Sequence, residues 1–169
     1  MSKIMSKIQS PAKIACIQMR ISYCRVEENL AEADRLIEAA CANGATLLIL
    51  PETFTTGSAF DTRAEAYAVA EAIPDGRTSQ FLLKKAREHG VYITGSFVER
   101  DGADLYNTAV LAGPDGLVGK FRKLHPCEDE VYWAEPGNLG IPVFHTPIGR
   151  IALLICLDAY YPECFRICA

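Results

Sequence analysis

The sequence lacks the features of a membrane protein and of a nucleic-acid-binding protein. Its 169 residues include no apolar run that approaches the roughly 20 residues needed to span a bilayer. Lys and Arg number 17 against 21 Asp and Glu, the formal net charge is −4, and the basic residues form no block. We therefore expect neither a membrane nor a nucleic acid as a partner. The opening segment MSKIMSKIQSPAKI lacks the apolar stretch of a secretory signal, so we expect a cytoplasmic protein.

Motifs for metal ions and nucleotide cofactors are also missing. The three histidines, His89, His125 and His145, are scattered without the spacing of metal ligands, and no CxxC pair occurs. The sequence contains no glycine-rich phosphate loop. We therefore expect that the protein uses neither a metal ion nor a cofactor.

The seven cysteines do not form a short, regular framework, so a disulfide scaffold is not expected and most of the thiols should be reduced. Cys16 lies in an alternating strand pattern and Cys41 on an apolar helix stripe. We interpret both as small buried apolar residues and not as nucleophiles.

A composition that is 50% hydrophobic is sufficient for a real core, and the length fits a single domain over residues 1–169 with a flexible start at 1–11. Apolar periodicity predicts helices and strands in alternation with no linker. The predicted helices are 27–43, ending at Asn43-Gly44, 64–72, and 78–89, capped by Thr78. The predicted strands are 13–19, 45–51, 91–99, 105–113, 117–123, 142–146 and 150–156, with a turn at 114–116. Parallel and antiparallel neighbours are thus mixed, which indicates an α/β fold of the α+β type, a sheet layered by helices.

Cys156 ends the apolar run RIALLIC and is followed by a turn and by Pro162-Glu163, which suit the first turn of a helix. A strand, turn and helix in this order resemble a nucleophile elbow, in which backbone N–H groups can bind an oxyanion. A neighbouring cation would lower the pKa of the thiol and activate it. Taken alone, Cys156 could equally be an inert cysteine at the end of a strand.

Glu52 and Lys123 also end apolar strands. Glu52 follows LLILP, a costly position for a carboxylate without a partner and a suitable one for a general base, although it could simply cap a loop. Lys123 belongs to the cluster Lys120-Arg122-Lys123, whose alternation is also typical of a solvated strand face. Three strand ends could bring a base, a cation and a nucleophile into one pocket.

Three segments together resemble the nitrilase, or carbon–nitrogen hydrolase, superfamily. They are ILPETFTTG around Glu52, YNTAVLAGPDGLVGKFRKLHP around Lys123 and GRIALLICLDAYYPE around Cys156, in the order of the family and over nearly the whole chain. The resemblance implies that these residues form the family's Cys-Glu-Lys triad.

Some branches of the family have a second Glu between the Lys and the Cys. The segment DEVYWAEPG resembles that region and places this residue at Glu130. Glu128, Asp129 and Glu135 are close in sequence and remain alternatives.

The implied reaction is hydrolysis of a small linear amide without a cofactor. Glu52 takes the proton of Cys156, the thiolate attacks the amide carbon, and Lys123 and the Leu157 N–H stabilise the negative charge. A thioester forms and water then hydrolyses it, while Glu130 holds Lys123 and the substrate in register. Nitrile-cleaving members commonly have Trp-Glu after the nucleophile, whereas this chain has Leu157-Asp158. This difference favours amidase, ω-amidase or N-carbamoyl amidohydrolase activity over nitrilase activity.

Complete members of the family resemble a four-layer α-β-β-α sandwich of roughly 260 residues that forms homodimers or higher homo-oligomers. The resemblance therefore implies a nitrilase-like sandwich whose C-terminal part is missing from this chain. An alternative function is that of a non-catalytic fragment that associates with full-length relatives.

Overall fold

The computed structural model describes residues 11–169, so the predicted flexible start falls almost entirely outside the described residues. Five strands form the main sheet in the order β1-β2-β3-β4-β5. The first three strands are parallel, and β4 and β5 continue the sheet as antiparallel hairpins. The strands are β1 (Ile14–Cys16), β2 (Leu47–Ile49), β3 (Tyr92–Asp101), β4 (Asp104–Gly113) and β5 (Gly116–Arg122). This arrangement confirms the predicted mixture of parallel and antiparallel neighbours.

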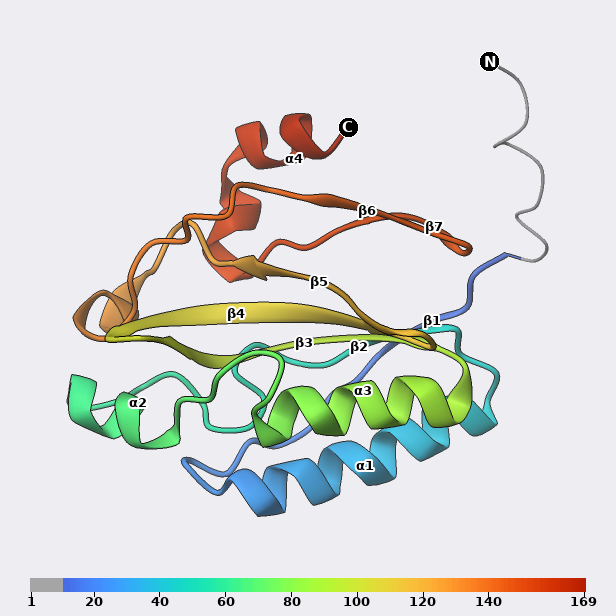
Figure 1. Ribbon diagram of the computed structural model, residues 1–169, viewed down its shortest axis with the longest axis horizontal. Helices are drawn as coiled ribbons and strands as arrows, with labels where there is room; N and C mark the ends of the chain where they lie inside the picture. The colour runs from blue at the N-terminus through green and yellow to red at the C-terminus, as the bar shows by residue number, and fades with distance from the viewer. Residues whose placement is uncertain (1–10) are drawn as a thin grey trace.

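Three helices cover one face of this sheet (Figure 1). They are α1 (Val26–Ala42), α2 (Arg63–Val69) and α3 (Arg77–His89). On α1 the residues at helical spacing, Leu30, Ala33 and Ile37, are buried against Leu48 and Ile93 of the sheet, as the periodicity predicts. Burial of this apolar stripe fixes α1 on the sheet and is its main source of stability.

The start of α3 differs from the prediction that Thr78 is its cap. The helix begins one residue earlier, after Gly76, and Thr78 is buried within its first turn. The backbone N–H of Thr78 and its hydroxyl both donate to the carboxylate of Glu71, each at 2.7 Å. A carboxylate from a preceding segment therefore satisfies the first turn of α3, which local sequence could not reveal.

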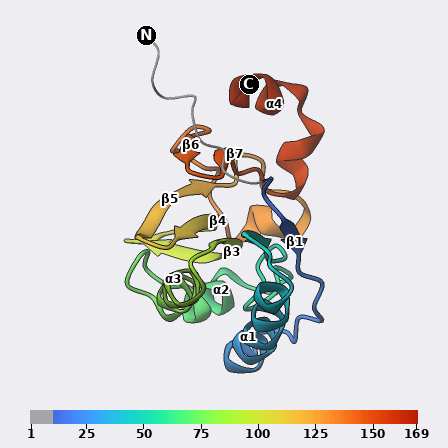
Figure 2. The same cartoon turned by 90° about the vertical axis from the view of Figure 1, so that its right-hand side faces the viewer.

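The opposite face of the sheet packs against a two-stranded hairpin, β6 (Val143–Thr146) and β7 (Gly149–Ala152). Beyond the hairpin lies α4 (Pro162–Cys168), so helices, sheet, hairpin and helix follow one another in layers (Figures 1 and 2). The order agrees with the predicted α-β-β-α sandwich. The predicted last strand, 150–156, is too long, because its strand pairing ends at Ala152. The core between the two sheets is formed by Leu47, Tyr92, Ala109, Leu111, Phe121, Leu153 and Ile155.

The hairpin does not extend over β1, and one prediction is wrong for that reason. No residue of β1 belongs to the core between the sheets. Cys16, predicted to be buried, is exposed, and Ile14 on the same strand is 57% exposed. A strand at the edge of a sheet buries its side chains only where a second layer covers it. Cys41 is half-buried and packs against the core under α1, close to its prediction.

Candidate active site

Glu52 lies just beyond the carboxyl end of β2, in a turn that is bound to β3. The N–H of Thr53 donates to the Ser96 hydroxyl at 2.9 Å, and the N–H of Phe54 donates to the Ser96 carbonyl at 3.1 Å. Thr53 has a positive φ of 44°, a conformation that a non-glycine residue adopts only when its surroundings impose it. The turn therefore holds the Glu52 side chain at the mouth of the sheet.

Lys123 follows the last residue of β5 and is 2% exposed. Its N–H donates to the Asn107 carbonyl at 2.9 Å, which extends the pairing with β4. Its ammonium group donates to Glu52 Oε1 at 2.8 Å and to Glu130 Oε2. Burial alone would lower the pKa of Lys123, but the two carboxylates outweigh it and raise the pKa, so the side chain stays cationic. The alternative of a solvated strand face is wrong for Lys123.

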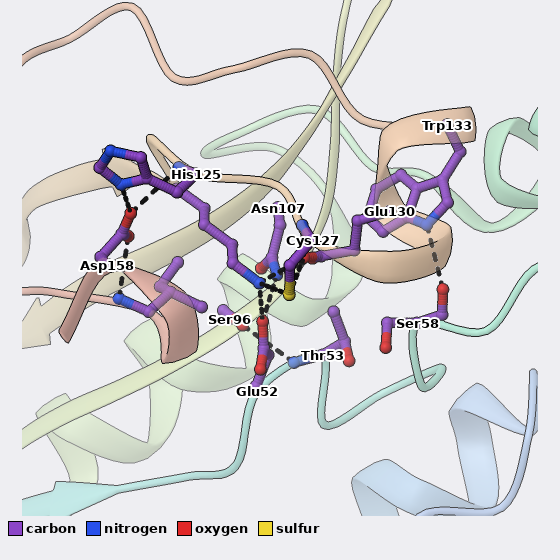
Figure 3. Close-up of polar contacts among 12 residues, drawn as sticks. Glu52, Thr53, Ser58, Ser96, Asn107, His125, Cys127, Glu130, Trp133 and Asp158 are labelled. Carbon is purple, nitrogen blue, oxygen red and sulfur yellow. Dashed lines mark hydrogen bonds and ion pairs between the residues drawn. The ribbon is translucent and has the colours of Figure 1, made fainter. Parts of the chain in front are cut away.

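Glu130 is buried on a short 3₁₀ helix, Glu128–Tyr132, and completes a charged group with Glu52 and Lys123. The side-chain amide of Asn107 donates to Glu52 Oε1 at 2.8 Å and to Glu130 Oε1 at 2.6 Å, so one amide joins the two carboxylates (Figure 3). We call Glu52, Asn107, Lys123 and Glu130 the cavity cluster.

The structure distinguishes Glu130 from the other acidic residues that the sequence left as alternatives. Glu128 and Asp129 are exposed, and Glu135 forms a half-exposed ion pair with Arg63 at 3.3 Å. Only Glu130 among these four contacts Lys123 in the described part of the chain.

Cys156 opens a second 3₁₀ helix, Cys156–Tyr160, with a positive φ of 48°. A cavity of about 130 Å³ is lined by Cys156 together with Glu52, Lys123 and Glu130 of the cavity cluster. The structure therefore brings together the four side chains that the sequence singled out. The positive φ is a strained conformation for cysteine and accords with the predicted elbow, although a 3₁₀ turn precedes α4.

A buried aspartate holds this elbow. Asp158 accepts hydrogen bonds from the N–H of Ile155 at 3.2 Å and from the N–H of His125 at 3.0 Å. The ring Nδ1 of His125 also lies 2.7 Å from Asp158 Oδ1. Because His125 is two residues after Lys123, and Asp158 two residues after Cys156, this contact joins the segment that carries the cation to the one that carries the thiol (Figure 3).

The predicted lowering of the Cys156 pKa is wrong. Desolvation of the sulfur is the main cause that raises the pKa of this thiol, and the negative charge of Glu52 raises it further, whereas Lys123 acts in the opposite direction. Lys123 cannot dominate, because two carboxylates already share its charge. The resting thiol is therefore protonated, and it could act as a nucleophile only with a base beside it.

Leu157 is the second residue of the 3₁₀ helix that Cys156 opens. Its backbone N–H takes part in none of the hydrogen bonds formed within residues 11–169. An N–H at the start of a helical turn is a suitable donor to a developing oxyanion.

Sequence reasoning missed Asn107, Cys127 and the pair formed by His125 and Asp158. Asn107 had a usable signal, because it is a polar residue inside the apolar strand LYNTAVLAG. Cys127 had none: its sulfur lies 3.7 Å from Lys123 Nζ only because the chain turns back after β5.

A second polar group, centred on the buried pair Glu99 and Arg122, lies on the same strands, and we call it the strand cluster. It consists of Glu99, Asp101, Thr108, Lys120 and Arg122. Arg122 binds Glu99 through two nitrogens, at 2.7 and 2.8 Å, and its guanidinium lies 3.8 Å from the centre of the Tyr106 ring. Arg122 is 3% exposed, so a solvated strand face is also wrong here.

Within residues 11–169, no group of three or more His, Cys, Asp and Glu side chains is placed to hold a metal ion. No helix in the described residues has the length and hydropathy needed to cross a bilayer.

Comparison with known proteins decides the family. A family model described as carbon–nitrogen hydrolase matches residues 13–169. The chain belongs to the carbon–nitrogen hydrolase family. A protein named nitrilase from Pyrococcus abyssi is 42% identical over 157 residues, which cover 93% of this chain and 60% of the relative. The omega-amidase of Danio rerio is 32% identical, over 95% of this chain and 60% of its own length.

Solved structures of carbon–nitrogen hydrolases share the fold. A superfamily protein from Xanthomonas campestris, with an arsenic adduct in its active site, has a TM-score of 0.81 and 28% identity over 91% of this chain and 56% of its own. Nit3 of Saccharomyces cerevisiae has the same TM-score and 26% identity, over 93% of this chain and 59% of its own. The chain thus spans about 60% of the length of these relatives. The resemblance seen in the three sequence segments is confirmed.

Proposed function

We propose that the protein hydrolyses the carbon–nitrogen bond of small linear amides through a thioester on Cys156. The observation that carries this proposal is the asymmetry of the Glu52 carboxylate. Its Oε1 atom accepts hydrogen bonds from both Lys123 and Asn107, whereas Oε2 accepts from no N–H or O–H group among the described residues, and the Cys156 thiol interacts with the same carboxylate. Glu52 and Cys156 line the same cavity. One oxygen is thus fixed and the other is available to take the thiol proton.

Acylation follows from this geometry. Glu52 Oε2 takes the Cys156 proton as the sulfur attacks the amide carbon, and the carbonyl oxygen becomes an oxyanion. The Leu157 N–H and the ammonium of Lys123 stabilise that charge. The carbon–nitrogen bond then breaks, Glu52 returns its proton to the leaving nitrogen, and ammonia departs from a thioester.

Deacylation reuses the same groups. Glu52, again ionised, takes a proton from a water molecule as the oxygen of that water attacks the thioester carbon. The carbon–sulfur bond breaks, Glu52 gives that proton to the sulfur, and a carboxylic acid leaves. Glu130 supports both steps through its contacts with Lys123 and Asn107, so we assign it a positioning role.

The raised pKa of Cys156 is consistent with this sequence of steps. A desolvated thiolate that faces the carboxylate of Glu52 would be costly, so the proton leaves the sulfur only as the new bond forms. The alternative of a non-catalytic fragment predicts no such arrangement and is not favoured.

The substrate is the less defined part of the proposal. Leu157-Asp158 after the nucleophile favours amides, including ω-amides and N-carbamoyl compounds. The 42% identity to a protein named nitrilase supports nitriles as a second candidate class. A cavity of about 130 Å³ lined by acidic side chains suits a small substrate without a negative charge near the reacting carbon.

We also propose a cytoplasmic, homo-oligomeric protein. Phe165 and Ile167 on α4 are 53% and 62% exposed, and Tyr160 just before it is 82% exposed. Apolar side chains gathered at one end of a molecule are typical of an interface. Light scattering of the purified protein would detect the oligomer.

Release of ammonia tests the activity. The purified protein is incubated with propionamide, glutamine, an N-carbamoyl amino acid and propionitrile, and compared with Cys156→Ala and with Cys16→Ser, a change at an exposed cysteine of β1. We expect ammonia from the amides with the parent and with Cys16→Ser, and none above background with Cys156→Ala. Equal release by Cys156→Ala and the parent would overturn the proposal, and release from propionitrile alone would favour the nitrilase candidate.

A further inference from the structure

A second thiol lies in the same cavity as Cys156, and hydrolysis does not use it. Cys127 immediately precedes the 3₁₀ helix of Glu130, and its N–H donates to Glu130 Oε2 at 3.2 Å. Its sulfur lies 3.7 Å from Lys123 Nζ and 3.6 Å from Glu130 Oε2 (Figure 3). Cys127 and Cys156 both line the cavity of about 130 Å³.

The two sulfurs are close enough to influence each other. The charge on Cys127 is among the causes that raise the pKa of Cys156, and both residues line the same small cavity. Hydrogen bonds between His125 and Asp158 hold the segment that carries Cys127 next to the segment that carries Cys156. Cys156 is exposed and Cys127 is half-buried, so an oxidant from solvent reaches Cys156 first.

We propose that Cys127 and Cys156 form a reversible disulfide when the protein meets a peroxide, and that Cys127 is the resolving thiol. The other cysteines are placed less well for this reaction. Cys164 is buried on α4, Cys16 lies on the edge strand β1, and Cys41 lies on α1. Neither Cys24 nor Cys168 lines the cavity that holds Cys156.

The reaction balances with hydrogen peroxide as the only oxidant. The Cys156 thiol loses its proton, the thiolate attacks one peroxide oxygen, the O–O bond breaks, and Cys156 becomes a sulfenic acid while the departing hydroxide takes up that proton and leaves as water. The sulfur of Cys127 then attacks the sulfenic sulfur, the S–O bond breaks, and the hydroxide takes the Cys127 proton to leave as a second water. The two thiols lose two electrons and peroxide gains them. A dithiol reductant reverses the bond by exchange.

Electrostatics in the cavity sets the pH dependence of the link. Both Cys127 and Cys156 have raised pKa values, mainly because of desolvation, so their thiolates are scarce near neutral pH. The charged residues that line the cavity are Glu52, Lys123, Glu128, Asp129 and Glu130. Glu52 disfavours the Cys156 thiolate and Glu130 the Cys127 thiolate, whereas Lys123 favours both. Formation should therefore accelerate as the pH rises, since the thiolate is the attacking species.

Such a disulfide would make the enzyme reversibly inactive and would protect Cys156 from irreversible oxidation. It removes the sulfur that the proposed hydrolysis needs, and it prevents further oxidation of that sulfur to the sulfinic acid, which thiols do not reverse. The role of Cys156 as nucleophile rests on the proposed function, whereas the link itself does not.

Peptide mapping after peroxide treatment tests the proposal. The reduced protein is treated with a few equivalents of hydrogen peroxide, quenched with N-ethylmaleimide and digested without reductant. Trypsin gives residues 124–150, in which Cys127 is the only cysteine, and 151–166, which contains Cys156 and Cys164. Chymotrypsin then cuts after Tyr160 and separates Cys156 from Cys164. We expect the Cys127 peptide joined to the Cys156 peptide, in a yield that rises with pH and disappears after dithiothreitol.

Three variants provide the controls, and circular dichroism confirms that each is folded. Cys127→Ser and Cys127→Ala should lose the link and accumulate sulfinic acid at Cys156, whereas Cys16→Ser should keep the link. Cys156 oxidised to sulfinic acid in the parent with no link, or linked to Cys164 instead, would overturn the proposal. Because the readout is a mass, a link without ammonia release would contradict only the proposed hydrolysis, and ammonia release without a link would contradict only the disulfide.

Discussion

The cavity cluster and the strand cluster are built from adjacent residues of the same strands and yet differ in their balance of charge. Asn107 and Thr108 are neighbours on β4, and Arg122 and Lys123 follow one another at the end of β5. Successive side chains of a strand point to opposite sides, so each pair serves both clusters. In the strand cluster two cations, Lys120 and Arg122, face two carboxylates, Glu99 and Asp101. In the cavity cluster one cation, Lys123, faces two carboxylates.

The number of hydrogen-bond donors to each carboxylate distinguishes a structural role from a chemical one. Glu99 accepts from Thr108, Lys120 and two nitrogens of Arg122, so both its oxygens are occupied. Glu52 keeps one oxygen without an N–H or O–H donor among the described residues, and that carboxylate lines a cavity with the Cys156 thiol, with which it interacts. A saturated buried carboxylate fixes strands in place, whereas an unsaturated one beside a cavity can accept a proton. Four predictions can break or sharpen this comparison.

The largest effect is expected from Glu52→Gln. The amide retains the size of the side chain and can still accept from Lys123, but it cannot take a proton, so kcat should fall by roughly 10²- to 10⁴-fold. Both acylation and deacylation should slow in single-turnover kinetics. Glu135→Gln, which alters a half-exposed ion pair with Arg63, is the matched control and should leave kcat unchanged. A Glu52→Gln protein with parental kcat would remove Glu52 from the mechanism.

Glu99→Gln should act on stability instead of chemistry. Removing a carboxylate that is 1% exposed leaves Lys120 and Arg122 without their shared partner, which should cost about 3–5 kcal/mol of unfolding free energy. Urea denaturation followed by circular dichroism measures this loss, and kcat per folded molecule should not change.

A compensating variant keeps the Glu99 prediction testable if the single change prevents folding. Glu99→Gln combined with Arg122→Met removes the unpaired charge, so the double variant should be more stable than Glu99→Gln alone. If the double variant is no more stable, the strand cluster does not act as a paired unit.

Glu130→Gln should have a smaller effect on catalysis than Glu52→Gln. The amide can still accept from Asn107 but no longer shares the charge of Lys123, so Lys123 moves closer to Glu52 alone. We expect kcat to fall by about 10- to 100-fold, as is usual when a positioning contact is lost. An effect as large as that of Glu52→Gln would mean that Glu130 itself transfers a proton.

The smallest expected effect is a pH dependence of stability that the strand cluster causes. Burial, the largest influence, raises the pKa of Glu99, but the hydrogen bonds from Arg122, Lys120 and Thr108 outweigh it and lower the pKa. A carboxyl with a lowered folded pKa stabilises the protein above the unfolded pKa of about 4.3, and this contribution is lost as the pH falls through the folded value. The stability gap between the parent and Glu99→Gln should therefore narrow below about pH 4. A gap that is constant from pH 6 to pH 3 would contradict the pairing.

Local sequence patterns were sufficient for most of the fold. The apolar stripe of α1, the turn between β4 and β5 and the alternation of strands and helices follow from periodicity and turn residues, and the structure agrees. The predictions for Thr78 and Cys16 were wrong because the surroundings of both residues depend on segments distant in sequence. The carboxylate of Glu71 binds Thr78, and the β6–β7 hairpin does not extend over Cys16.

In the site, the sequence identified the residue types but not their electrostatic balance. Glu52, Lys123, Glu130 and Cys156 could be selected because they lie in segments that resemble the family. The raised pKa of Cys156 could not be predicted, because it depends first on desolvation of the sulfur in the folded cavity and then on the negative charge of Glu52. Likewise, the link through Asn107 between those carboxylates depends on the register of β4 against β5.

The most direct test of the central claim, that Cys156 is the nucleophile and Glu52 its base, is to trap the thioester. The protein is mixed with propionamide, quenched in acid after one turnover and digested with trypsin, and the peptide 151–166 is fragmented to locate any acyl group. The account predicts a propionyl group on Cys156 in the parent, much less of it in Glu52→Gln, and none in Cys156→Ala. Ammonia release with an acyl group on another residue, or undiminished acylation in Glu52→Gln, would contradict it.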